Sequence, residues 1–314
     1  MSNIELTPVQ IKSVKGNGFL HNRGTEKFSG RIITENGVLT GEQMAVLSEA
    51  AQKFGNGTMV FTVRLTIELP GIDFDNIEPF REFVAKAGMV TGGTGSRVRP
   101  VVACKGTTCV FGLCDSQGLA GEIHKRFYEG YYDVVLPHKF KIAVGGCPNN
   151  CVKPDLNDLG IVGQRVPGID YDNCHGCKKC GMVEACPMDA IHVVDGKVNI
   201  NKEKCNNCGR CVGKCVFKIA ENCTDMYKVY VGGKWGKKHR PGNELNKLFT
   251  KDEALDVVEK AILLFKQKGI SGERFGDMVE RLGIEKVEKM LISNNLLKNK
   301  EEILEIQTIA GAKC

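Results

Sequence analysis

The chain carries CHGCKKCGMVEACP at residues 174–187 and CNNCGRCVGKC at residues 205–215. Each stretch supplies three cysteines at steps of three residues and a fourth after a longer gap. Such a triplet can wrap three corners of a [4Fe–4S] cubane, while the fourth corner comes from the distant cysteine of the other stretch. We therefore expect two clusters with crossed ligand sets, one held by Cys174, Cys177, Cys180 and Cys215 and the other by Cys205, Cys208, Cys211 and Cys186.

The number and setting of the cysteines argue against a disulfide framework. The chain has fifteen cysteines, and its start, MSNIELTPVQIKSVKG, lacks the apolar stretch of a secretory signal. We therefore expect a cytoplasmic protein, in which thiols stay reduced and serve as ligands. Zinc is the alternative metal, but zinc sites use two cysteine pairs separated by a longer spacer rather than tight triplets.

The overall composition is that of a globular protein with about two domains. Of the 314 residues 42% are apolar and 25% are charged, and no run reaches the roughly 18 apolar residues of a membrane span. The net charge is +6, and the basic residues are scattered rather than interleaved with aromatics, so nucleic-acid binding is not expected. No G-x-G-x-x-G follows a strand, so no nicotinamide or flavin site is expected.

Helix and strand patterns on both sides of the cysteine-rich region predict an α+β fold. Turns are expected at Asn36-Gly37 and at Asp195-Gly196, and a capping box of Thr250 and Glu253 should begin a helix. Further helices are expected at 40–55, 75–88 and 116–132, and strands at 59–69 (closed by Pro70), 139–144 and 227–233. The expected domains are 1–90, then 91–164 together with 223–314, and an inserted module at 165–222.

Four more cysteines lie before the module. Cys104 and Cys109 occur in ACKGTTCVFGLCDS, and Cys147 and Cys151 occur in VGGCPNNC. The C-P-N-N-C loop brings two thiolates together on a tight turn, as the edge of a cluster requires. Taken alone, these residues fit buried structural cysteines almost as well.

Three stretches resemble the sirohaem-dependent sulfite and nitrite reductase family: VVACKGTTC (101–109), LPHKFKIAVGGCPNNC (136–151) and YKVYVGGKWGKKHRPG (227–242). Within that family, the inserted module makes the chain most similar to the catalytic C subunit of anaerobic sulfite reductase and to the related domain of coenzyme-F420-dependent sulfite reductase. The resemblance implies a single reductase repeat with an inserted bacterial-type 2[4Fe–4S] ferredoxin module. It also implies sirohaem and three [4Fe–4S] clusters.

In this family four cysteines bind the sirohaem-coupled cluster, and the last of them bridges to the sirohaem iron. The resemblance therefore implies Cys104, Cys109, Cys147 and Cys151 as ligands, with Cys151 as the bridge. The family usually has five residues between the first two ligands, whereas four separate Cys104 from Cys109 here. The downstream residues fit the family frame with Cys109 as ligand, which leaves Cys114 as a spare thiol.

Basic residues are expected to bind the anions. Sulfite is a dianion whose three oxygens leave as water, so the pocket must bind negative charge and supply protons. The resemblance implies Arg64, Arg99, Lys139 and Lys141 for sulfite, although an alternating K-x-K alone more often marks a solvated strand face. The sirohaem carboxylates also need basic partners, for which Arg31, Lys237, Lys238 and Arg240 are the candidates.

The expected partners follow from the single repeat. Larger family members hold sirohaem between two repeats, so we expect a homo-oligomer or a complex with other subunits. Electrons would come from reduced ferredoxin or from a partner subunit and pass through the ferredoxin module. Nitrite remains open as the substrate, and a haem-free multi-cluster electron carrier remains open as the function. No role is predicted for Cys223 and Cys314.

Overall fold

The computed structural model describes residues 6–307, so Cys314 lies outside the described residues. The chain divides into two compact units. The first unit comprises Met1–Val102, Ala120–Ala143 and Glu259–Cys314, and the second comprises Ala103–Leu119 and Val144–Val258. No helix in the described part of the chain is both long and apolar enough to cross a membrane.

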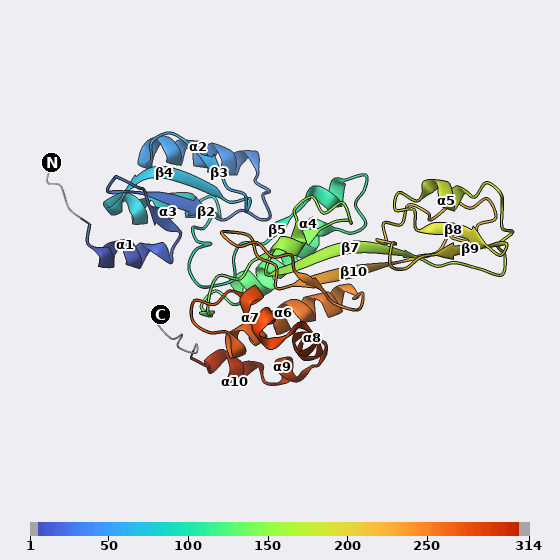
Figure 1. Ribbon diagram of the computed structural model, residues 1–314. Coiled ribbons are helices and arrows are strands. Elements are labelled where there is room, and N and C mark those ends of the chain that lie inside the picture. The colour runs from blue at the N-terminus through green and yellow to red at the C-terminus, as the bar shows by residue number, and fades with distance from the viewer. Residues whose placement is uncertain (1–5, 308–314) are drawn as a thin grey trace. The chain divides into compact units, whose positions relative to one another are not determined.

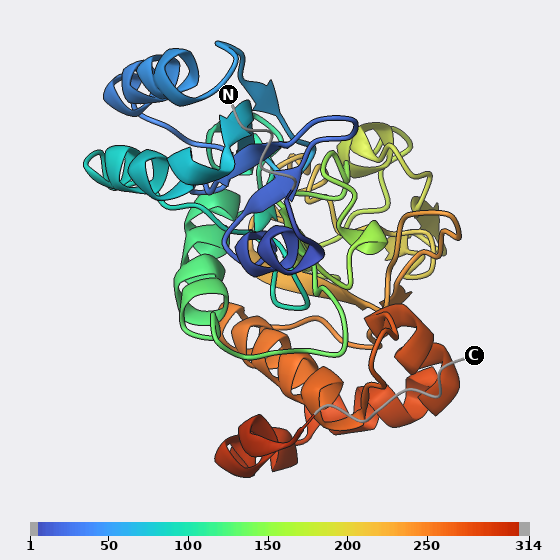
Figure 2. The ribbon, with the colours of Figure 1, turned by 90° about the vertical axis from the view of Figure 1, so that its left-hand side faces the viewer.

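The first unit begins with a four-stranded antiparallel sheet of order β1-β2-β4-β3. Its helices α2 and α3 lie next to each other (Figure 2) and bury Leu47, Phe54 and Phe80 in one core with the strands. Phe80 packs edge-on against Phe19 and Phe54, with ring centroids 5.9 and 6.0 Å apart. The elements are α1 (Pro8–Lys15), β1 (Phe19–His21), β2 (Lys27–Ile32), α2 (Gly41–Phe54), β3 (Val60–Phe61), β4 (Ile67–Asp73), the 3-10 turn Phe74–Asn76 and α3 (Ile77–Ala85).

The strand predicted at 59–69 is wrong, because this segment is two strands. β3 and β4 pair antiparallel around a turn in which Leu65 has a left-handed φ of 59°. Pro70 lies inside β4 rather than ending it. The β2–β4 ladder has a bulge beside it, with the register shifting between Phe28 and Gly30. A bulge tolerates proline because no ladder hydrogen bond is required from it.

The predicted turn at Asn36-Gly37 is confirmed, with φ angles of 56° and 86°. These positive values match a tight hairpin turn. Pairing around the turn is limited to an isolated bridge between Glu35 and Val38. The helix predicted at 40–55 follows as α2, which begins at Gly41 after a capping box of Thr40 and Gln43.

The remaining helices follow the predicted patterns. The helix predicted at 116–132 forms as α4 (Ser116–Ile123), which continues as a π-helix over His124–Glu129. The predicted capping box of α6 (Lys251–Lys268) is confirmed, since Thr250 and Glu253 exchange hydrogen bonds of 2.9 and 3.3 Å. The chain ends in α7 (Phe275–Leu282), α8 (Ile284–Ile292), α9 (Asn295–Lys298) and α10 (Lys300–Glu305). The apolar face predicted for α6 is buried at Ala254, Leu255, Val258, Ala261, Ile262 and Phe265.

A five-stranded sheet of order β11-β10-β7-β6-β5 organises the second unit. Its strands are β5 (Val102–Ala103), β6 (Ile142–Gly145), β7 (Leu159–Pro167), β10 (Cys223–Val231) and β11 (Asn243–Glu244), and 3-10 turns cover Lys105–Thr108 and Pro154–Leu156. β7 and β10 pair antiparallel along their full length, from Leu159 opposite Val231 to Pro167 opposite Cys223 (Figure 1). The cysteine-rich segment therefore leaves and rejoins the sheet at two neighbouring residues, which lets it fold as an insertion without disturbing the ladder.

The cysteine-rich segment has its own small core of Met182, Ile191, Val198, Cys211, Ile219 and Ala220. It contains α5 (Gly181–Ala185) and a hairpin of β8 (Ile191–Val194) and β9 (Lys197–Ile200). The predicted turn at Asp195-Gly196 is confirmed by φ angles of 49° and 71°. We call residues 168–222 the cysteine module.

Candidate functional site: cysteine loops and an arginine cluster

Two loops of the second unit bring the cysteines before the module together. Cys104 follows β5, and its backbone N–H donates to the Val144 carbonyl of β6 at 3.1 Å. In return, the N–H of Gly146 donates to Cys104 Sγ at 3.1 Å. The loops touch at Gly106 and Gly146: a Cβ on Gly146 would lie 2.7 Å from the Gly106 Cα. Only glycine permits this approach.

The other thiols of this group lie within electrostatic reach of one another. Burial raises the pKa of Cys147, the Asn149 N–H opposes that rise, and the negative charges of Cys104, Cys151 and Cys109 add to it. The structure therefore brings the predicted set Cys104, Cys109, Cys147 and Cys151 into one neighbourhood. Four cysteines gathered in this way could serve as the ligands of one cluster.

Cys114 is a half-buried thiol beside this group. Its Sγ lies 3.9 Å from the Gly146 carbonyl, and a Cβ on Gly163 of β7 would lie 2.7 Å from it. Burial, with smaller contributions from Cys104 and Asp115, raises the pKa of Cys114 to about 12. Cys114 thus packs against the sheet.

One set of cysteines in the module surrounds a small cavity. Cys186, Cys205, Cys208 and Cys211 all line it, together with Pro187. Burial raises the pKa of Cys211 to about 11, and the charges of Cys205, Cys208 and Cys186 add to the rise. The Ala190 N–H donates to Cys186 Sγ at 3.4 Å. This grouping matches the crossed set predicted from the spacing.

The other set also lies at the module core. Cys174, Cys180 and Cys215 pack against the core residues, and the Val198 N–H donates to Cys174 Sγ at 3.2 Å. Each of the three cysteine groups thus has one thiol that accepts a backbone N–H. Such bonds stabilise thiolates and tune the potential of a bound cluster. Within residues 6–307, no three His, Cys, Asp or Glu side chains gather closely enough to hold a single metal ion.

A cavity of about 400 Å³ joins the two cysteine-bearing regions of the second unit. Cys147 and Asn149 line it from the loop after β6, and Cys208 and Arg210 line it from the module. Arg165 of β7 lies between them, and its N–H donates to the Asn207 carbonyl at 2.8 Å. The set that contains Cys208 therefore faces the Cys147 loop.

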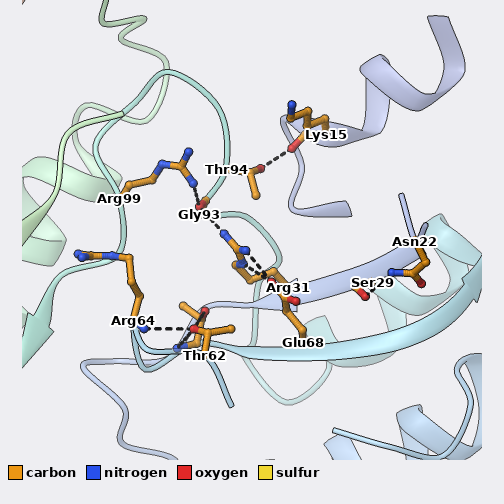
Figure 3. Close-up of polar contacts among 11 residues, drawn as sticks. Lys15, Asn22, Ser29, Arg31, Thr62, Arg64, Glu68, Gly93, Thr94 and Arg99 are labelled. Atoms are coloured by element: carbon orange, nitrogen blue, oxygen red, sulfur yellow. Dashed lines mark hydrogen bonds and ion pairs between the residues drawn. The ribbon is translucent and has the colours of Figure 1, made fainter. Parts of the chain in front are cut away.

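Two predicted basic residues of the first unit, Arg31 and Arg99, meet at the Gly93 carbonyl, while the Arg64 guanidinium points away from it (Figure 3). Arg31 and Arg99 both donate from their guanidinium groups to the Gly93 carbonyl, the former at 3.0 Å. Arg31 also forms an ion pair with Glu68 at 2.5 Å. Arg64 donates to the carbonyls of Pro100 at 2.6 Å and Ile142 at 3.1 Å. These contacts hold three cations in fixed positions.

Sequence reasoning missed the loop that arranges these arginines. Gly93 and Gly95 adopt left-handed φ angles of 70° and 85°, and Arg99 also donates to the Gly95 carbonyl at 2.8 Å. The Gly93 N–H donates to the Tyr128 hydroxyl at 3.0 Å, which anchors the loop to the π-helix. The signal was present as three glycines within residues 92–95.

Lys139 and Lys141 lie before β6, because the strand begins at Ile142 and not at 139 as predicted. Both are half-buried and flank the buried Phe140, so the segment alternates as an extended chain does. His138 accepts a hydrogen bond from the Lys139 N–H at 2.8 Å. Burial and the cations Lys139, Arg274 and Arg99 lower the pKa of His138 to about 4. Three cations therefore lie within electrostatic reach of the His138 imidazole.

The predicted sirohaem-binding residues near 240 form a separate loop in the second unit. Lys234 and Arg240 form an isolated β-bridge, and the Arg240 guanidinium donates to the Gly232 carbonyl at 2.8 Å and to Asn243 Oδ1 at 2.5 Å. These hydrogen bonds of Arg240 therefore stabilise the loop between β10 and β11. Lys237 and Lys238 are exposed at the tip.

Two family descriptions match this chain. The "Nitrite and sulphite reductase 4Fe-4S domain" covers residues 94–300, and the "Nitrite/Sulfite reductase ferredoxin-like half domain" covers residues 21–87. The chain belongs to the nitrite and sulphite reductase family. The ferredoxin-like half domain contains Arg31 and Arg64, and the 4Fe-4S domain contains every cysteine of the described region.

Members of this reductase family with curated descriptions are similar over most of the chain. An uncharacterized protein of Methanocaldococcus jannaschii is 33% identical over 81% of this chain and 87% of its own length. The coenzyme F420-dependent sulfite reductase of the same organism is 32% identical over 77% of this chain, but only 38% of its own length. The C subunit of the anaerobic sulfite reductase of Salmonella typhimurium is 28% identical over 77% of this chain and 73% of its own length.

Solved structures share the fold. Dissimilatory sulfite reductase I (DsrI) aligns with a TM-score of 0.65 at 20% identity, over 84% of this chain and 69% of that chain. The NirA protein of Mycobacterium tuberculosis aligns with a TM-score of 0.63 at 14% identity, over 98% of this chain and 49% of that chain. The predicted sulfite and nitrite reductase-like fold is thereby confirmed.

Proposed function

We propose that this chain reduces sulfite to sulfide at a sirohaem coupled to a [4Fe–4S] cluster. The proposal is carried by the meeting of the Cys104 and Cys147 loops, where four cysteines gather across a contact that only glycines allow. Relatives named as sulfite reductases of anaerobic, dissimilatory and F420-dependent types support the choice of substrate.

The residues present fit these cofactors. Cys104, Cys109, Cys147 and Cys151 would hold the coupled cluster, with Cys151 as the bridge to the sirohaem iron, and the exposed Cys151 thiol leaves room for such a bridge. Arg31, Lys237, Lys238 and Arg240 are proposed to meet the sirohaem carboxylates. Sirohaem, when bound, supplies an iron centre that accepts sulfite and receives electrons from the adjoining cluster.

The basic residues of the first unit would bind and protonate the substrate. Converting sulfite to sulfide consumes six electrons and six protons and releases three waters. Arg64 and Arg99 are held in place by backbone carbonyls, and guanidinium groups suit the binding of an oxyanion such as sulfite. Lys139 and Lys141 would add positive charge and donate protons as oxygen leaves. Preorganised cations of this kind stabilise charge without rearranging during the reaction.

The cysteine module would bring the electrons. We propose that residues 165–222 are a 2[4Fe–4S] ferredoxin domain, inserted between 91–164 and 223–314, with 1–90 as the ferredoxin-like half of the reductase. The two module clusters and the coupled cluster then make three [4Fe–4S] clusters per chain. Because the chain has one repeat, a second copy or other subunits would complete the sirohaem site.

Purification under strictly anaerobic conditions, followed by visible spectroscopy, tests the proposal. We expect Soret and red bands of a tetrapyrrole that acid extraction removes, together with about twelve cluster irons and one sirohaem iron per chain. Clusters without a tetrapyrrole would instead identify an electron carrier. Turnover with reduced methyl viologen should favour sulfite over nitrite, and the opposite preference would make the chain a nitrite reductase.

A further inference from the structure

The cysteine module exposes an apolar surface next to the thiols of one cysteine set. Val216 and Phe217 directly follow Cys215, and their side chains are 82% and 48% exposed. The ring of His175, which follows Cys174, packs at a tilt of 44° against the Phe217 ring, with centroids 4.2 Å apart. We call His175, Val216 and Phe217 the outer patch.

The outer patch does not belong to the packing of the module. The buried core of the module consists of other residues, among them Met182, Ile191 and Val198. Exposed apolar groups that contribute nothing to a core mark contact surfaces when they are gathered together. The residues of the outer patch follow the proposed cluster ligands Cys174 and Cys215 in the chain. Because electron transfer slows steeply with distance, a surface this close to a cluster suits the docking of an electron donor.

The other end of the module already has a neighbour. Cys208, a member of the set Cys186, Cys205, Cys208 and Cys211, lines the same cavity as Cys147. This leaves the set of Cys174, Cys177, Cys180 and Cys215 as the outward end of the module. An electron from outside would therefore arrive at the outward set and leave through the inward one.

The charges around the outer patch define the kind of donor. Lys178 and Lys179 lie between ligands Cys177 and Cys180, and Lys214 precedes Cys215; all three are exposed. Within residues 6–307 none of the three takes part in an ion pair. Exposed positive charge beside the ligands of the outward set steers and orients a partner of opposite charge.

We propose that the outer patch and its three lysines are the docking surface for a small acidic ferredoxin. This inference rests on the proposed function of the module as an electron relay. In each encounter the reduced ferredoxin gives up one electron and is oxidised, and the outward cluster gains that electron. Six encounters supply one sulfite.

Binding of a clostridial-type 2[4Fe–4S] ferredoxin to the cluster-loaded protein tests the surface. Lys178→Glu/Lys179→Glu should raise the Kd about tenfold or more at low salt, and the effect should shrink as salt is added. Phe217→Ala should raise the Kd with little change in salt dependence. The matched control is Lys202→Glu/Lys204→Glu, which reverses two exposed lysines of the same module beside Cys205 of the inward set.

Methyl viologen separates this inference from the proposed function, because a small dye needs no docking surface. We expect the Lys178→Glu/Lys179→Glu variant to keep wild-type viologen-driven sulfite reduction while its ferredoxin-driven rate falls. Equal Kd changes in the patch and control variants, or none in either, would overturn the docking surface. Absence of viologen-driven turnover in the wild type would instead refute the reductase, while the ferredoxin Kd would still report on the surface.

Discussion

The Gly146 N–H donates a hydrogen bond to Cys104 Sγ at 3.1 Å. This bond ties the loop after β5 to the loop after β6, and the contact between Gly106 and Gly146 makes it possible. The proposed coupled cluster therefore depends on a backbone feature as much as on its thiols.

Gly146→Ala should release the coupled cluster. The new Cβ would lie 2.7 Å from the Gly106 Cα, so the two loops must separate and the four thiols can no longer share one cluster. We expect the loss of sirohaem and of about four cluster irons per chain, measured by iron analysis and visible spectroscopy. Gly41→Ala is the control, because its Cβ would meet nothing within 4 Å. A Gly146→Ala protein with full iron and sirohaem would contradict this account.

Cys109→Ser and Cys114→Ser should behave differently. Cys109 is among the charges that act on Cys147, whereas Cys114 packs under Gly163 with its Sγ near the Gly146 carbonyl. We expect Cys109→Ser to lose the coupled cluster and Cys114→Ser to keep it with a shifted midpoint potential. Redox titration followed by electron paramagnetic resonance measures both. Loss of the cluster in Cys114→Ser alone would make Cys114 the ligand.

The pH dependence of stability should carry a contribution from His138. Its pKa falls to about 4 in the folded protein, because of burial and the cations Lys139, Arg274 and Arg99, from an ordinary value of 6.5. At a pH between these two values, the imidazole is protonated in the unfolded chain but not in the folded protein. The folding stability therefore falls as the pH falls through this window, and His138 adds no pH dependence above it. His138→Gln should therefore lose less thermal stability than wild type between pH 7 and pH 5. Identical losses would rule out this contribution.

Thr250→Ala should destabilise the start of α6. The Thr250 hydroxyl accepts the Glu253 N–H at 3.3 Å, and the Glu253 carboxylate accepts the Thr250 N–H at 2.9 Å. Removing the hydroxyl should cost about 1 kcal/mol of folding free energy, seen as a lower thermal midpoint of the cluster-loaded protein. Thr250→Ser keeps the cap and should stay near wild type. A midpoint equally low in Thr250→Ser would place the effect in the lost methyl group and not in the cap.

Residue spacing along the chain was enough to predict the local features. The turns at Asn36-Gly37 and Asp195-Gly196 followed from residues that tolerate positive φ. The capping box of Thr250 and Glu253 spans four residues and is equally local. Such features need no knowledge of distant parts of the chain, because the interacting groups are neighbours in sequence.

Features that join distant segments emerged only once the chain was folded. Pro70 lies inside β4 because a bulge in the pairing with β2 accommodates it. Arg31 and Arg99 share the Gly93 carbonyl as their anchor, although Arg31 is 62 residues from Gly93 in the chain and Arg99 is 6 residues from it. The pairing of Pro167 with Cys223 likewise explains how the module is inserted. Long-range contacts of this kind are selected by packing and backbone pairing across the whole fold, and residue spacing along the chain does not encode them.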